Sequence, residues 1–234
     1  FVQTVADILA STGARLSQRG FYTGLFLITA CTLMLQVLQT RILSVVAWYH
    51  LAFFAISMAM FGLTAGAVFV YLRRERLTTA TLAHDLAYYS SAFALGTFVC
   101  LALQLTLAPV IQWSLAAVLA WGLLAVCMAV PFFFAGVIVS LALTRSPFPI
   151  GRVYGVDLLG AAAGCIGALA LLNVTDAPSG VIWIAALGAA AALAFATSST
   201  EPSAAQRPPL HGLLSRRWAL LAVLAGVALA DGFT

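Results

Sequence analysis

The sequence has very few charged residues and contains no lysine. Only 8% of its 234 residues are charged, 11 of them arginines and 7 of them Asp or Glu, whereas a soluble domain carries roughly a quarter. So few charges cannot cover the surface of a water-soluble domain of this size. The composition therefore excludes an ordinary soluble globular domain, a disordered chain and a protein that binds nucleic acid.

Cysteines and catalytic signatures are also scarce. The four cysteines lie far apart in apolar stretches, and we interpret them as small buried hydrophobic residues: Cys31, Cys100, Cys127 and Cys165. The sequence has no Walker, GxGxxG, HExxH or GxSxG motif and no close pair of carboxylates. The three histidines fall in three different loops or interfaces, which argues against haem ligation. We therefore assign no catalytic, cofactor-binding or metal-binding residue to this chain.

Long apolar runs dominate what is present. Hydrophobic residues make up 63% of the chain, and the mean hydropathy is +1.07. A helix crosses a bilayer with about 20 apolar residues. The sequence therefore predicts an all-α fold, a polytopic transmembrane helical bundle whose main partner is the lipid bilayer. About seven spans fit best, at 21–46, 50–72, 86–108, within 112–144, and at 153–173, 180–197 and 217–233.

The fourth of these stretches is too long for one straight span. Pro131 lies in its middle and should kink the helix, because proline removes a backbone hydrogen bond. Two short helices there would make eight spans. Ten of the eleven arginines fall on one side of the membrane if 112–144 is a single traverse and the N-terminus is cytoplasmic. We therefore predict seven spans with a cytoplasmic N-terminus.

The composition also suggests a division of the chain. In residues 1–20 apolar residues recur at near-helical spacing with polar and charged residues between them, which is typical of a short amphipathic helix lying at the membrane interface. A six-helix membrane domain follows at 21–197. Residues 198–216 are rich in Ser and Pro and predict a cytoplasmic linker before the seventh helix at 217–234. The chain begins without Met, so we expect a truncated start.

Three polar residues inside apolar stretches are candidate functional residues: Gln36, Arg41 and Asp157. Arg41 is either an anchor at the outer interface or part of a polar intramembrane cluster with Gln36 or Gln39. Gln36 lies nearer the middle of the membrane and should face other helices or a cavity. Asp157 either complements a helix N-terminus, or forms a salt bridge to Arg145 or Arg152, or couples to protons or cations.

Glycines at helical spacing predict close helix packing. They form two small-residue faces, Gly62 with Gly66, and Gly160 with Gly164 and Gly167. Either face could pack within this chain or against another membrane subunit, and the sequence leaves both possibilities open.

Two segments, 29–74 and 130–174, resemble the membrane domain of multi-pass spermidine-synthase-like proteins. These are bacterial proteins in which hydrophobic helices are fused to an aminopropyltransferase-like domain. Arg41 matches an arginine of the family's first helix, but Gln36 stands where the family has an acidic residue. Pro131 and Gly136 match a broken helix. A later family motif is matched by Gly151, Tyr154, Asp157, Gly160 and Ala161.

The resemblance implies a non-catalytic inner-membrane module that anchors an enzyme domain or handles a small hydrophobic or cationic molecule. It also implies that an aminopropyltransferase-like domain is missing from these 234 residues, unless the membrane domain stands alone. Two other functions stay open from the residues themselves. One is an accessory subunit packed in a larger membrane complex, and the other is a small-molecule transporter with a polar midplane cavity.

Overall fold

The computed structural model describes residues 17–46, 51–75, 77–106 and 115–198. In these residues the chain is entirely helical, without strands, and six helices are long and apolar enough to cross a membrane. They are α2 (Gln18–Val46), α3 (Leu51–Leu72), α4 (Leu82–Thr106), α5 (Leu115–Arg145), α6 (Ile150–Val174) and α7 (Ala177–Ala196), with a short 3-10 turn η1 (Thr79–Thr81) before α4. The all-helical prediction is confirmed.

The six helices agree with the first six predicted spans to within a few residues at each end. Two of the differences concern where a helix begins, because α2 starts at Gln18 and α4 starts at Leu82. The amphipathic segment, the linker and the seventh span fall almost wholly outside the described residues. The structure therefore contains six candidate spans and does not bear on the seventh.

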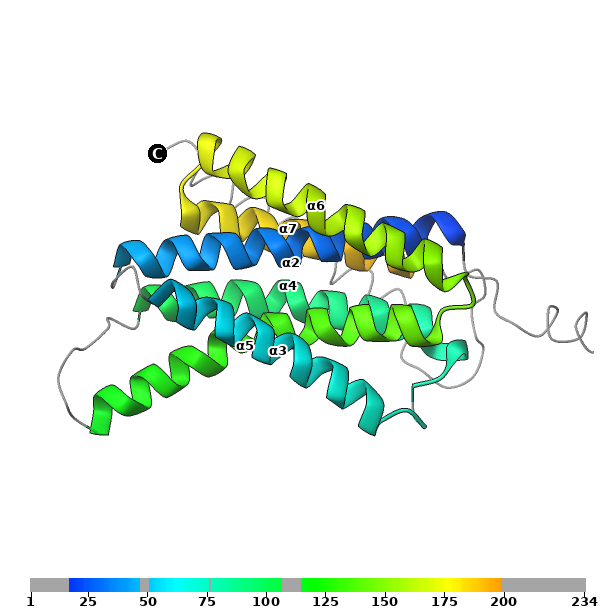
Figure 1. Cartoon of the computed structure of the whole chain (residues 1–234), viewed down its shortest axis with the longest axis horizontal. Helices are drawn as coiled ribbons and strands as arrows, with labels where there is room; N and C mark the ends of the chain where they lie inside the picture. Colours follow the sequence, from blue (N-terminus) through cyan, green and yellow to red (C-terminus); the bar gives the residue numbers. More distant parts are fainter. Residues whose placement is uncertain (1–16, 47–50, 76, 107–114, 199–234) are drawn as a thin grey trace, which may run out of the picture.

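Successive helices run in opposite directions, as a chain that crosses a membrane repeatedly requires (Figure 1). In consequence α2 and α6 point the same way. Helix α7 lies between α2 and α4, α6 packs mainly on α2, and α3 packs mainly on α5. The core lies along α2, α4 and α7, where Leu25, Phe93 and Phe195 are fully buried.

Helix α5 is one continuous helix that contains Pro131. Its two ends run in different directions in Figure 1, and Pro131 lies near the middle. Proline has no N–H to donate to the carbonyl four residues earlier, and its ring crowds that carbonyl, so a bend is the expected result. Residues 115–145 therefore form one continuous helix that is long enough to cross a membrane, and not two short helices.

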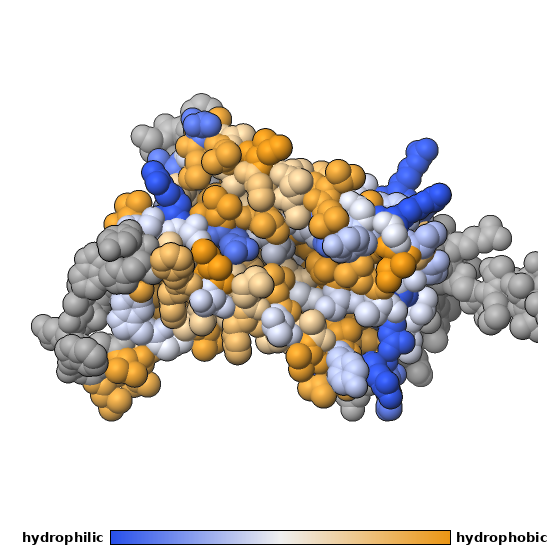
Figure 2. Space-filling model, viewed as in Figure 1, coloured by the Kyte–Doolittle hydropathy of each residue, from blue (hydrophilic) through white to orange (hydrophobic). Residues whose placement is uncertain are grey.

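The surface of the bundle divides into apolar sides and hydrophilic ends. Hydrophilic residues gather mainly at the ends of the helices, and apolar residues cover most of the middle (Figure 2). Many of the exposed side chains on the middle are large and apolar, among them Phe61, Val99 and Ile166. This distribution suits a bundle whose sides face lipid chains and whose ends face headgroups and water.

Candidate functional site

Three glycines of α6 bring its backbone against α2. A side chain at Gly160 would meet the hydroxyl of Thr29, and one at Gly164 would meet the carbonyl oxygen of Ala30. At Gly167 the nearest atom would be the sulfur of Met34, at 3.2 Å from an added Cβ. In the described residues, α2 of the same chain therefore occupies this glycine face, and no other subunit is needed to cover it.

The second pair of glycines does the same between α3 and α5. A Cβ at Gly62 would lie 2.5 Å from the carbonyl oxygen of Ala129, and one at Gly66 would meet that of Phe133. The approach is mutual, because Gly136 of α5 faces the backbone of Leu63 in α3. Small residues thus let both helix pairs pack backbone to backbone.

The polar residues of α2 separate into different surroundings. Arg41 is exposed and Gln36 is half-buried, and no hydrogen bond joins either side chain to another described residue. Gln39, in contrast, is only 2% exposed. The side chain of Gln39 bonds to another helix. Among the described residues, no hydrogen bond joins Arg41 to Gln36 or to Gln39.

Gln39 forms a hydrogen bond between helices that the sequence did not predict. The Nε2 of Gln104 in α4 donates to the Oε1 of Gln39 in α2 over 2.9 Å. The Oε1 of Gln104 is buried and has no hydrogen-bond partner among the described residues. The two amides satisfy part of each other's need in an apolar surrounding, where an unpaired amide is costly. In the sequence, each glutamine lies one helical turn after an apolar residue that is buried in the structure, which indicates that the glutamine also faces the bundle.

Asp157 lies inside α6, on the stripe that faces α2. It is half-buried and falls between Val153 and Gly160, which are both buried. The first turn of α6 contains no acidic residue, so Asp157 lies beyond the range in which a helix N-terminus stabilises an anion. None of the ion pairs among the described residues joins Asp157 to Arg145 or Arg152. Two of the three interpretations of Asp157 therefore lack support in the geometry.

Arginines gather at one end of the bundle. Arg145, at the end of α5, donates from Nη2 to the carbonyl oxygen of Arg74 over 2.8 Å. The guanidinium of Arg73 lies 4.9 Å from the centre of the Phe69 ring. In the sequence, these arginines indicate only the orientation of the chain in the membrane. Their pattern does not predict that Arg145 contacts the end of α3.

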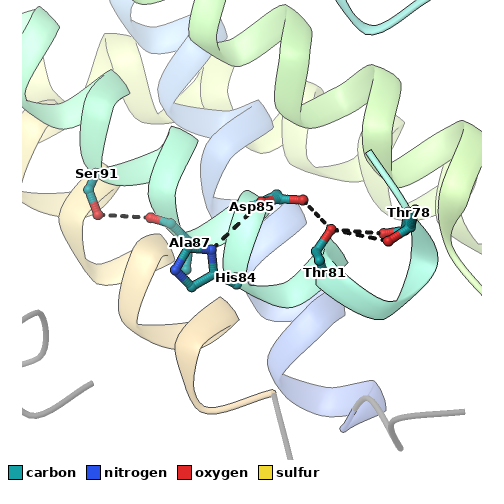
Figure 3. A network of polar contacts seen from close by, with 6 residues as sticks. All are labelled: Thr78, Thr81, His84, Asp85, Ala87 and Ser91. Carbon is teal, nitrogen blue, oxygen red and sulfur yellow. Dashed lines mark hydrogen bonds and ion pairs between the residues drawn. The ribbon is translucent and has the colours of Figure 1, made fainter. Parts of the chain in front are cut away.

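The first turn of α4 carries a small polar network at the same end (Figure 3). The hydroxyl of Thr81 donates to Asp85 over 2.6 Å, and the Nδ1 of His84 lies 3.7 Å from the other oxygen of that carboxylate. An acidic residue in a first turn is favourable there, because it complements the partial positive charge of the helix N-terminus. This network fits a helix start better than a catalytic site.

The candidate polar residues do not converge on one site. Asp157 lies towards the start of α6 and Gln104 towards the end of α4, at opposite ends of the bundle (Figure 1). The residues described contain no group of three or more His, Cys, Asp or Glu that could hold a metal ion. What the arrangement can do is hold helices together, and the functional candidates that remain are single residues.

Comparisons of the chain with models of protein families, with curated proteins and with solved structures give no match.

Proposed function

We propose that this chain is a non-catalytic integral membrane module that holds an enzyme domain at the cytoplasmic face of a bacterial inner membrane. The observation that carries the proposal is the packing of the two glycine faces. Gly160 and Gly164 of α6, like Gly62 and Gly66 of α3, press against the backbone of a neighbouring helix. Such close backbone contacts suit a rigid support better than a bundle that must open and close around a substrate.

The orientation is part of the same proposal. The described residues contain six arginines, and Arg41 lies towards one end of the bundle. The other five lie at the opposite end: Arg19, Arg73, Arg74, Arg145 and Arg152. Arginine-rich ends favour the cytoplasmic side. With a cytoplasmic N-terminus, the 198–216 linker would lie on the cytoplasmic side. A seventh span at 217–233 would place any domain that follows it on the opposite side of the membrane.

We therefore expect an enzyme domain to be held on the cytoplasmic side, through contact with the linker or with the arginine-rich end of the bundle. The resemblance to spermidine-synthase-like membrane proteins suggests an aminopropyltransferase-like enzyme. The full-length gene product should then fractionate with membranes together with that activity. The mass of the intact protein and the proteins that copurify with it are the decisive measurements. Membranes that hold the protein but neither the activity nor an associated enzyme would contradict the proposal.

A small-molecule transporter is the second candidate, and Asp157 is the observation that favours it. A half-buried carboxylate without an ion-pair partner among the described residues is unusual within a spanning helix. If transport is the function, uptake of a cationic substrate into vesicles should be lost in Asp157→Asn and in Gln36→Ala. The matched control is Ser57→Ala, which removes an exposed hydroxyl of α3 that donates only to the carbonyl oxygen of Phe53 in its own helix. Uptake that is unchanged in both variants would exclude this candidate and leave the anchoring role.

A further inference from the structure

The end of the bundle where α3 and α5 finish concentrates positive charge from two helices. Arg73 and Arg74 follow directly after α3, and Arg145 closes α5. The bond from Arg145 to the carbonyl oxygen of Arg74 brings the two helix ends together. That bond uses one Nη donor, so most N–H donors of the three guanidinium groups remain available to an anion.

No carboxylate of the described residues forms an ion pair with these arginines. Among the described residues the one ion pair joins His84 to Asp85, and Glu75 pairs with none of them although it follows Arg74 directly. Arg73 and Arg74 are exposed, and Arg145 is half-buried. The guanidinium of Arg73 lies 4.9 Å from the centre of the Phe69 ring, and none of its N–H donors is hydrogen-bonded to a described residue, so these donors can bind an anion.

The surface beside these arginines is apolar. Val68, Tyr71 and Leu72 lie on the last turns of α3 and are 50%, 71% and 74% exposed. A ligand that covered this surface would need an apolar part next to its anionic group. Inorganic phosphate has no such part, whereas a phospholipid has both a phosphate and acyl chains at this depth of a membrane.

We propose that the arginines at the joined ends of α3 and α5 bind the phosphate of an anionic phospholipid, whose acyl chain lies along the exposed side chains of α3. Arg145 is the positioning residue, since its bond to Arg74 holds the two helix ends together. Arg73 and Arg74 supply donors to the phosphate. This inference does not depend on the proposed anchoring function, because a lipid site could belong to an anchor, a transporter or a subunit.

Native mass spectrometry of the full-length protein tests the proposal directly. The protein is reconstituted in nanodiscs of equimolar phosphatidylglycerol and phosphatidylcholine and then released, and the lipids that stay bound are counted. We expect retained phosphatidylglycerol in excess of phosphatidylcholine. In Arg73→Gln and Arg74→Gln the affinity should fall about fivefold for each arginine removed, because each basic residue near an anionic surface contributes on that scale.

Arg41→Gln is the matched control, because it removes an exposed arginine towards the opposite end of the bundle. Its lipid binding should equal that of the wild type. An equal loss in Arg41→Gln, or equal retention of both lipids by the wild-type protein, would overturn the proposal. Full displacement by inorganic phosphate would also overturn it, since the ligand would then be a soluble anion. The wild-type comparison of the two lipids does not require any variant to fold.

Discussion

Helices α6 and α7 follow one another in the chain, are both rich in alanine and glycine, and differ greatly in burial. In an apolar stretch of 18 residues within each helix, 67% of the residues of α7 are buried, but only 17% of those of α6. Helix α7 is also the shortest of the six spans, with 20 residues. Similar composition thus produces a central helix in one case and a peripheral helix in the other.

The positions of the small residues explain part of this difference. In α6 the glycines that approach a neighbour form one stripe, and all of them face α2. In α7, Gly180 lies against Leu38 of α2, and Gly188 lies against Phe93 of α4. A helix with small residues on two faces can pack between two neighbours, whereas a helix with one such stripe packs closely on one neighbour and leaves the remainder to lipid.

The largest effect is expected where α6 meets α2 most closely. In Gly164→Leu the new side chain would press on the carbonyl oxygen and Cα of Ala30, which are backbone atoms and cannot rotate away. We expect the free energy of unfolding to fall by about 3 kcal/mol, and α6 to separate from α2. Unfolding by SDS in mixed micelles, followed by circular dichroism, measures the change.

Gly155→Leu is the matched control on the same helix. A Cβ at Gly155 meets no atom within 4 Å, so we expect a change below about 0.5 kcal/mol. Equal losses in the two variants would mean that the glycines matter for the helix itself and not for its contact with α2.

Equivalent deletions on the two helices should differ in their effect on stability. Ile184 of α7 is fully buried, and Ile166 of α6 is 71% exposed. Ile184→Ala should lower the free energy of unfolding by about 2 kcal/mol, because a cavity remains among packed neighbours. Ile166→Ala should change it by less than about 0.5 kcal/mol. The same unfolding titration decides, and a reversed order would show that α7 is not the central helix.

The amide pair links α2 to α4, the two neighbours of α7, and should contribute less. Replacing Gln39 or Gln104 alone by leucine leaves the other amide without its partner, whereas the double variant removes both polar groups. A double-mutant cycle should give a coupling free energy of about 0.6 kcal/mol, which is the average for such bonds between membrane helices. Strictly additive losses would show that the two amides do not interact in the membrane.

Much of this fold could be predicted from the sequence, because charge distribution alone separates spans from loops. The six described helices, and the continuity of α5 through Pro131, agree with the predicted pattern of spans. Which helix is central could not be predicted, because lipid chains are as apolar as a protein core and hydropathy does not distinguish the two. The glycines at 160 and 164 indicated a packed face, but not that α2 fills it.

The candidate residues were harder to predict for a different reason. Arg41 and Gln36 stand out because they are polar within an apolar run, and the geometry gives neither a hydrogen bond to another described side chain. The bond between Gln39 and Gln104 joins residues 65 positions apart, so no local pattern could pair them. The meeting of Arg145 with Arg74 likewise depends on how α3 packs on α5.

The smallest expected effect concerns the outer side of α6. Ala162 is exposed there, and Ala162→Leu adds a side chain of the kind that already covers this side, such as Leu158 and Leu169. If lipid faces this side, the free energy of unfolding should change by less than about 0.5 kcal/mol, and the set of copurifying proteins should not change. If another subunit packs here, the larger side chain should reduce the recovery of that subunit while the isolated chain keeps its stability. Quantitative mass spectrometry of the purified complex separates these outcomes, because only a protein contact, and not a fluid lipid layer, is sensitive to the shape of one added side chain.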